Sequence, residues 1–266
     1  MSRAAAVGLM LIATLAPLSA GADTGSGKKR RPLPSEFGRV VLEPVGEKGT
    51  LPAVVFEHWL HRSKFTCRLC HVDIGFAMKA GGTNVKAADN EAGYYCGACH
   101  NGKLVVQGQK VFASCAKATP SQACYRCHSV GKNVVPEIDF ASLTRNLPRG
   151  RFGNGVDWEK AEQAKLIHPI DELDGISIKR QPITAQKDFA LSPKLEGMPE
   201  IIFSHKKHTV WSGCEGCHPD IFVGVKKGVT KYTMVEIFDG KYCGVCHSSV
   251  AFPTLDCQRC HVRAVQ

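Results

Sequence analysis

Cys67-Arg-Leu-Cys70-His71 is the first of six segments in this chain that share the pattern Cys-x-x-Cys-His. Twelve of the 13 cysteines and six of the 11 histidines lie in these segments. The other five segments are Cys96/Cys99/His100, Cys124/Cys127/His128, Cys214/Cys217/His218, Cys243/Cys246/His247 and Cys257/Cys260/His261. In c-type haem attachment, two such thiols bind one porphyrin covalently and the histidine ligates its iron. The sequence therefore predicts six covalently bound haem c groups.

Paired cysteines of this spacing also occur in zinc ribbons, and cysteines of exported proteins form disulfides. Here a histidine follows every one of the six pairs. Zinc ribbons do not require that histidine, whereas covalent haem attachment does. We therefore interpret all six segments as haem sites rather than zinc sites or structural disulfides.

The first 22 residues have the features of a secretory signal peptide. Arg3 gives a basic start, residues 4–18 are apolar, and Ala20-Gly-Ala22 offers a cleavage site. An uncleaved membrane anchor is the alternative interpretation, although the apolar stretch is short for a membrane span. Covalent haem attachment takes place outside the bacterial cytoplasmic membrane. We expect a periplasmic protein, or one exported to the outer surface, with no membrane span after cleavage.

The formal charge of +10 at first suggests an anionic partner such as nucleic acid. Loss of the signal peptide removes Arg3, and each haem adds two propionates. Six haems would bring the net charge to about +3 when oxidised and about −3 when reduced. We interpret most basic residues as counter-charges for propionates, expect no nucleic-acid partner, and interpret residues 28–31 as a solvated basic tail.

An internal repeat fixes the organisation of the chain. A shift of 147 residues places Phe56 on Phe203, Cys67 on Cys214 and Cys96 on Cys243 without a gap. The copies then diverge, because the first carries a 14-residue insertion, roughly residues 104–122, that contains Cys115. We predict a signal peptide (1–22), an N-terminal arm (23–50), triheme module 1 (51–128), a connector (129–197) and triheme module 2 (198–266).

Three haems in under 80 residues leave little room for a conventional apolar core. We therefore predict mostly irregular chain, with short helices and few short strands wrapped around the haems. Strand-like pieces are expected just before His58 and His205, and the arm is expected to be loose. In the connector, residues 156–165 predict a short helix with Asp157 as its N-cap.

Two histidines precede the first haem segment of each module. Phe56-x-His58-x-x-His61 corresponds to Phe203-x-His205-x-x-His208 in the second copy. Three residues apart on an extended or turning segment, the two imidazoles of a pair can point to different sides and serve two irons. Protein ligation on both faces of a haem favours electron transfer, whereas an open face allows small-molecule chemistry.

The chain resembles the triheme cytochromes of the c7 type, which are periplasmic electron carriers related to the tetraheme c3 cytochromes. The resemblance rests on Phe-x-His-x-x-His, on three haem segments per module, and on Gly-x-x-Cys-Gly-x-Cys-His at residues 93–100 and 240–247. It implies that His58 ligates the haem at His71, and His205 that at His218. By the same resemblance, His61 serves the haem at His100 and His208 the haem at His247.

The third haem of each module, at His128 and His261, departs from the family pattern. The stretches 84–95 and 231–242 lack the histidine that the family usually has before its second haem segment. The candidates for these two irons are Met78, Met234 and His168, and thioether ligation would raise the reduction potential. Packing against porphyrin, an exposed loop histidine, or a five-coordinate iron are the alternatives. Cys115 is interpreted as a free thiol, with an iron ligand or an intermolecular disulfide as the alternatives.

These features predict an electron carrier rather than an enzyme. We expect a periplasmic hexahaem cytochrome that passes electrons between redox partner proteins, such as a quinol-oxidising complex or other cytochromes, in anaerobic or extracellular respiration. One alternative is a multihaem reductase that acts at a haem without a sixth protein ligand. Another is a subunit of a cytochrome filament or outer-membrane conduit.

Overall fold

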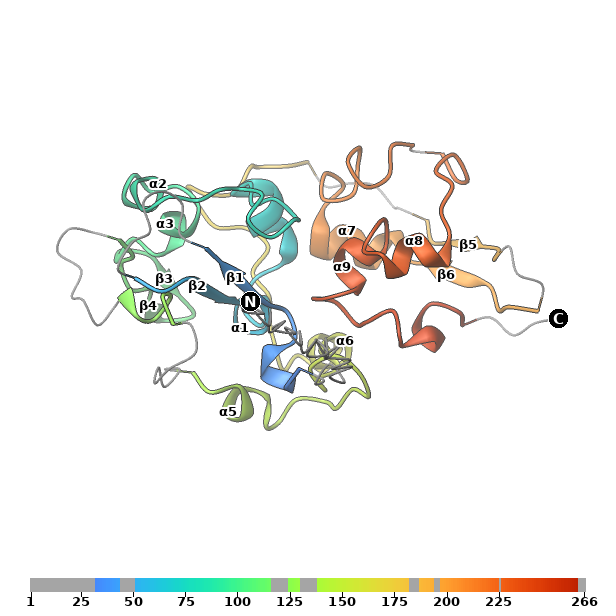
Figure 1. Cartoon of the computed structure of the whole chain (residues 1–266), viewed down its shortest axis with the longest axis horizontal. Helices are drawn as coiled ribbons and strands as arrows, with labels where there is room; N and C mark the ends of the chain where they lie inside the picture. Colours follow the sequence, from blue (N-terminus) through green and yellow to red (C-terminus); the bar gives the residue numbers. More distant parts are fainter. Residues whose placement is uncertain are drawn as a thin grey trace, which may run out of the picture. The chain divides into compact units, whose positions relative to one another are not determined.

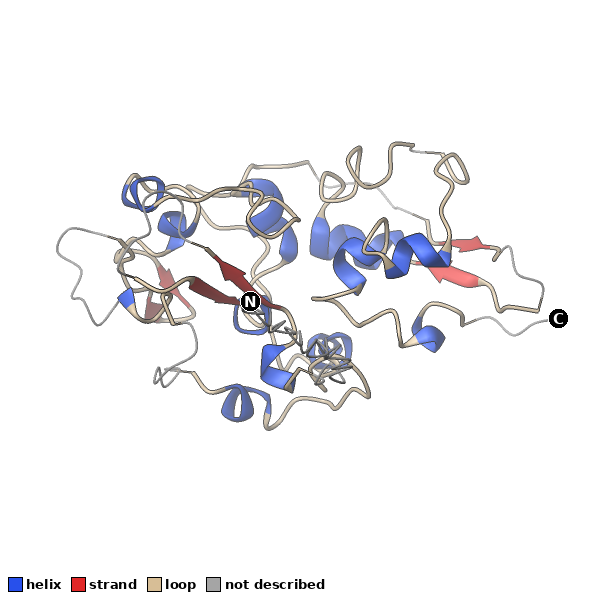
Figure 2. Cartoon of the chain, viewed as in Figure 1, coloured by secondary structure: helices blue, strands red, loops and turns tan. Residues whose placement is uncertain are grey.

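A computed structural model describes residues 32–43, 51–115, 124–129, 138–181, 187–193, 197–224 and 226–262. The predicted signal peptide and the basic run at 28–31 lie outside these residues. Figure 2 shows that most of the described chain is loop, joined by short helices and three two-stranded antiparallel sheets. No helix in the described part of the chain is long and apolar enough to cross a membrane. The predicted fold class is confirmed.

In module 1, strand β2 (Val54–Glu57) leads directly into helix α1 (His58–Arg62). A π-helical turn, Leu69–Asp73, carries the end of the first Cys-x-x-Cys-His segment. Helices α2 (Ala87–Glu91) and α3 (Cys96–Cys99) follow, and then a small hairpin of β3 (Val105–Val106) and β4 (Gln109–Lys110).

Module 2 repeats this order of elements. Strand β6 (Ile201–Phe203) leads into α7 (His205–Ser212), and α8 (Met234–Phe238) is followed by α9 (Gly244–His247). A 3-10 turn, Cys257–Arg259, carries the last segment. β2 and β6 confirm the strands that the sequence predicted just before His58 and His205.

The N-terminal arm is more ordered than the sequence predicted. A 3-10 turn at Pro34–Glu36 precedes strand β1 (Arg39–Leu42), which pairs with β2 so that Val40 lies opposite Phe56. The connector contains the counterpart, β5 (Phe189–Leu191), which pairs with β6 (Figure 1). Each copy of the repeat therefore has a β-hairpin at its start. The first strand of the hairpin lies upstream of residue 51 or 198, and the second strand lies inside the module.

The buried apolar core lies mostly in the connector, between the two copies of the repeat. Helices α5 (Phe140–Thr144) and α6 (Trp158–Gln163) belong to it, and the Asp157 carboxylate caps α6 by accepting a hydrogen bond from the Lys160 backbone N–H. This confirms the predicted connector helix. The buried cluster consists of Trp59, Leu147, Val156, Trp158, Ala161 and Ile167.

A glycine in each module explains part of the repeated pattern Gly-x-x-Cys-Gly-x-Cys-His. A Cβ atom on Gly97 would lie 1.9 Å from the carbonyl oxygen of Asn90, and one on Gly244 would lie 2.0 Å from that of Ile237. Both distances are far below van der Waals contact. The helix that carries the second cysteine pair therefore packs against the preceding helix through a position that only glycine can occupy.

The 14-residue insertion of module 1 is divided into two parts. Phe112 packs on His100 with ring centres 4.5 Å apart, as Phe252 packs on His247 at 4.2 Å. The backbone N–H of Ser114 bonds the carbonyl of His100, as that of Thr254 bonds the carbonyl of His247. These matches leave seven extra residues before Phe112, which include the β3–β4 hairpin, and seven after Ser114.

Substitution of Gly97 by alanine tests the close approach of α3 to α2. Gly97→Ala should destabilise the protein by about 1–3 kcal/mol, because the added methyl group overpacks a contact with backbone. Gly75→Ala is the matched control, since nothing lies within 4 Å of its Cβ position and only its positive φ is strained. Thermal unfolding of the purified proteins measures both. Equal losses would contradict the packing explanation.

Candidate haem-binding sites

The first pair of predicted ligands lies face to face. The imidazole rings of His58 and His71 have centres 6.4 Å apart and planes that differ by 5°. Two imidazole nitrogens bound on opposite sides of one metal ion, each at about 2 Å, place their ring centres about 6 Å apart. The separation of His58 and His71 therefore fits a six-coordinate haem iron between them.

Two further pairs have the same separation. The ring centres of His61 and His100 are 6.4 Å apart, and those of His208 and His247 are 6.2 Å apart. These are the pairs that the resemblance to c7-type cytochromes implied. The donor sets and their spacing fit haem iron at these three pairs. Among the described residues no such ring pair joins His205 to His218, so the assignment of His205 to the haem at His218 rests on the repeat alone.

A phenylalanine holds both upstream imidazoles in each copy. Phe56 stacks on His61 with ring centres 4.3 Å apart and meets His58 edge-on at 4.8 Å. Phe203 repeats both contacts, at 4.4 Å to His208 and 5.0 Å to His205. Edge-on and stacked arrangements are those that aromatic rings favour. This packing gives the Phe-x-His-x-x-His pattern a physical reason.

Backbone carbonyls fix the orientation of the upstream histidines. Nδ1 of His58 lies 2.6 Å from the carbonyl oxygen of Gly38, just before β1, while Nδ1 of His61 lies 3.1 Å from that of Glu57. In module 2, His205 and His208 make the same contacts to the carbonyls of Lys187 and Ser204. An imidazole that donates from Nδ1 leaves Nε2 free for a metal ion.

Histidines of the Cys-x-x-Cys-His segments are oriented in the same way. His71, His218 and His247 have Nδ1 within 2.6–2.8 Å of a carbonyl oxygen four or five residues later. The third segment of each module instead folds back to the start of the module. Nδ1 of His128 lies 2.7 Å from the Pro52 carbonyl oxygen, and that of His261 lies 2.8 Å from the Pro199 carbonyl oxygen.

Burial keeps four of the candidate ligands neutral. It lowers the pKa of His58, His61 and His247 to about 4, and it also lowers the pKa of His208. Only a neutral imidazole has a nitrogen lone pair for a metal ion, so these side chains are in the binding form at neutral pH.

The candidates for the third haems occupy different places in the two copies. Met78 is 37% exposed and Met234 is 39% exposed, and His168 is exposed as well. Met234 is the first residue of α8, and its counterpart in module 1 is Ala87, the first residue of α2. The two methionines are thus not equivalent in the repeat, and ligation of the third irons stays a prediction.

Cysteine pairs that follow one another along the chain also lie close to one another in space. Burial, and then the nearby thiolates of Cys99 and Cys67, raise the pKa of Cys70 to about 12. Burial, with Cys127 as the next cause, raises the pKa of Cys96 to about 11. The pKa of Cys243 rises to about 11 through burial and the nearby Cys260. The second attachment site of each module therefore neighbours both the first and the third.

A cavity of about 630 Å³ lies beside the second attachment site of module 1. Its walls include Tyr95 and Ala98 around that site, Asp73 and Ile74 after the first site, and Ile176 of the connector. This volume is within the range of cofactor-binding sites. The connector therefore lines a space that fits a porphyrin, a role that its sequence did not suggest.

These features match one protein family, described as cytochrome c7 and related cytochrome c, over residues 54–129 and 201–262. The two matches cover more than half of the chain. The chain belongs to this family. Its members are multihaem c-type cytochromes whose domains are electron carriers, which confirms the predicted tandem c7-like organisation and covalent haem c as the cofactor. Comparison with functionally curated proteins returns no match.

Solved structures of multihaem cytochromes are similar to this c7-family chain. A c7-type three-heme cytochrome domain is 35% identical and covers 29% of this chain and 95% of its own, with a TM-score of 0.26. The C-terminal hexaheme fragment of GSU1996 is 25% identical and covers 84% and 96%, with a TM-score of 0.25. The dodecaheme cytochrome c GSU1996 is 25% identical and covers 86% and 75%, with a TM-score of 0.27.

Removal of one upstream histidine from this c7-type cytochrome tests the ligand pairs. His58→Ala should convert one low-spin haem to a form that binds carbon monoxide, because the iron above His71 loses its second imidazole. Absorption spectra of the reduced protein, with and without carbon monoxide, measure the change against the unmodified protein. No gain in carbon monoxide binding would contradict the assignment of His58.

Proposed function

We propose that this chain is a periplasmic hexahaem c-type cytochrome that passes electrons between partner proteins of an anaerobic or extracellular respiratory chain. The observation that carries the proposal is the set of imidazole pairs at haem-binding separation, each made of one histidine from a Cys-x-x-Cys-His segment and one upstream histidine. Ligation on both faces suits electron transfer rather than substrate binding.

Six sites hold the haems in this proposal. The twelve cysteines of the six segments form the thioether bonds, and His71, His100, His128, His218, His247 and His261 ligate the irons. His58, His61, His205 and His208 are the second ligands of four irons, while Met78, Met234 and His168 remain the candidates for the other two. When bound, haem supplies an iron that alternates between the ferric and ferrous states.

The polypeptide orients and insulates these sites. Backbone carbonyls direct Nδ1 of the histidines away from the metal position, and Phe56 and Phe203 restrict the rotation of the upstream rings. Hydrogen bonding from Nδ1 raises the basicity of an imidazole ligand, which stabilises ferric iron and lowers the potential. Such fixed ligands need little rearrangement when the charge of the iron changes.

The neighbouring cysteine pairs place the attachment sites of a module in a series. Electrons can then cross the chain in short steps without a substrate pocket. The N-terminal sequence supports export to the periplasm, or onward to the outer surface, where multihaem c-type cytochromes typically function. We propose a quinol-oxidising complex or other cytochromes as redox partners, and a role as a filament or conduit subunit is an alternative in the same location.

A reductase is the second candidate function, and one observation favours it. In the described part of the chain, no histidine ring is paired with His128, His218 or His261 as His58 is with His71. His205 is the proposed second ligand at His218, whereas no histidine equivalent to it is assigned to His128 or His261. A haem there with an open face could bind a small oxyanion or a metal ion.

Haem counting tests the proposed function. The mature protein should carry six haems by intact mass, and full reduction should take six electrons in an anaerobic titration. Cys257→Ala combined with Cys260→Ala should lower both counts by one, because only the last attachment site is lost. A mass equal to that of the bare polypeptide, with no Soret absorption, would overturn the proposal. Carbon monoxide binding by the unmodified reduced protein would favour the reductase.

A further inference from the structure

Three contacts join module 1, in or near its first attachment segment, to module 2. The strongest is an ion-pair cluster around Arg180 of the connector. Its guanidinium lies 2.6 Å from the Asp73 carboxylate and 3.0 Å from the Glu215 carboxylate. Asp73 follows His71 by two residues, and Glu215 lies between Cys214 and Cys217. One side chain thus bridges the two first attachment segments of the modules.

The three partners differ in burial. The Asp73 side chain is 0% exposed and the Arg180 side chain is 15% exposed, whereas Glu215 is 52% exposed. A buried carboxylate needs a charged partner, because desolvation without one is expensive. The Asp73–Arg180 pair is therefore a buried ion pair that fixes Arg180 to module 1, and the exposed Glu215 contact joins Arg180 to module 2.

Arg68 makes a second contact between the same segments. It lies between Cys67 and Cys70 and pairs with Asp171 of the connector at 3.0 Å. A Cβ on Gly213, which directly precedes Cys214, would lie only 2.9 Å from Cδ of Arg68. The side chain of Arg68 therefore packs against the residue that begins the first attachment segment of module 2.

Arg62 makes the third contact and lies half-buried between two tryptophans. It donates a hydrogen bond of 3.0 Å to the Val250 carbonyl oxygen, three residues after the second attachment segment of module 2. Its guanidinium lies 4.9 Å from the ring centre of Trp158 and 5.5 Å from that of Trp211. Burial raises the pKa of Cys246 to about 12, and the nearby Cys67 and Cys217 add to the rise. Cys246 of module 2 therefore lies near Cys67 of module 1.

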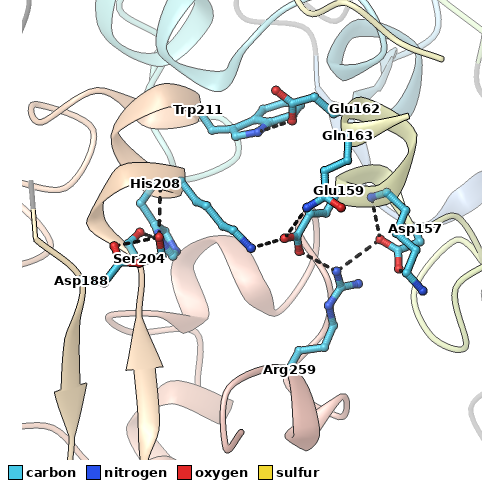
Figure 3. Close-up of polar contacts among 11 residues, drawn as sticks. Asp157, Glu159, Glu162, Gln163, Asp188, Ser204, His208, Trp211 and Arg259 are labelled. Carbon is cyan, nitrogen blue, oxygen red and sulfur yellow. Dashed lines mark hydrogen bonds and ion pairs between the residues drawn. The ribbon is translucent and has the colours of Figure 1, made fainter. Parts of the chain in front are cut away.

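The connector holds the third attachment segment of module 2 separately. Arg259, between Cys257 and Cys260, lies 2.9 Å from Glu159 and 3.2 Å from Asp157 at the start of α6 (Figure 3). Lys207 of α7 also pairs with Glu159, and Trp211 donates a hydrogen bond of 2.8 Å to Glu162. The last haem site of module 2 thus faces the connector helix, while the first segment faces module 1.

We propose that Arg180 is a positioning residue that holds the Cys67–His71 segment beside the Cys214–His218 segment, so that electrons cross between the modules at these two sites. This inference rests on the proposed function. It departs from a simple head-to-tail order, in which the third site of module 1 would lead into the first site of module 2. Electrons would instead leave module 1 from its first attachment site and enter module 2 at its first site.

The test compares three variants of the full-length holoprotein. Arg180→Gln removes both ion pairs. Glu215→Gln removes only the ion pair with module 2 and keeps the buried Asp73–Arg180 pair. Lys179→Gln is the matched control, because it removes the same charge from the exposed neighbouring residue. Haem content by mass and Soret absorption is measured first for each variant.

The decisive measurement is the redox interaction between the haems at His71 and His218. Exchange NMR of partly reduced samples gives the shift in the midpoint of one haem when the other is reduced. We expect a clear interaction in the unmodified protein. Arg180→Gln and Glu215→Gln should lower it, by roughly half if the separation of the two irons doubles. Interactions within each module, and all interactions in Lys179→Gln, should be unchanged.

Hydrogen–deuterium exchange of the same holoproteins gives a second readout. Backbone exchange in residues 66–74 and 211–217 should increase in Arg180→Gln and Glu215→Gln but not in Lys179→Gln. The inference is overturned if the unmodified protein shows no interaction between the two haems, or if Glu215→Gln keeps it in full. Either result with six haems present leaves the proposed function intact, whereas a protein without haem defeats the proposed function itself.

Discussion

The spacing of the attachment sites is the constraint on which the rest of the structure depends. In the proposed hexahaem form, each module surrounds three large, flat, apolar groups with fewer than 80 residues, so that most of its interior is cofactor rather than side chain. Long helices and wide sheets would not leave room for those groups. Short helical turns or plain turns at the cysteine pairs present the thiols and the following histidine, while the loops between them form the walls.

Because of this constraint, much of the packing between protein side chains falls to the connector. The buried apolar cluster gathers around Trp158 and Ala161 in the connector, with Trp59 as the contribution of module 1. The connector also supplies β5 to the hairpin of module 2 and Ile176 to the cavity in module 1. A segment that has no attachment site therefore provides much of the protein-only packing between the haem-rich parts.

Several features were readable from the sequence because their chemistry is local. A thioether site requires cysteines and a histidine at fixed spacing, so the six candidate sites and the two copies of the repeat could be read directly from the sequence. The helix at Trp158–Gln163 was predictable from Asp157, whose capping contact reaches only three residues along the chain. The short strands before His58 and His205 followed from the short apolar runs at residues 53–56 and 201–203.

Other features depend on contacts between distant residues and left little trace in the sequence. Strand β1 has only four residues, and the hydrogen bond from His58 to the Gly38 carbonyl uses a backbone atom that no side-chain pattern reveals. The ion pairs of Arg180 join residues about 35 and 107 positions away. The repeat could have located β5, since β1 and β5 precede the equivalent histidines at nearly equal spacing.

The return of His128 to Pro52 and of His261 to Pro199 makes the first and last parts of each module meet. A unit with adjoining ends can be copied in tandem, because the joining chain enters and leaves at one place and cuts no internal contact. Gene duplication could thus lengthen the electron path three haems at a time, and only the joining segments would have to evolve anew.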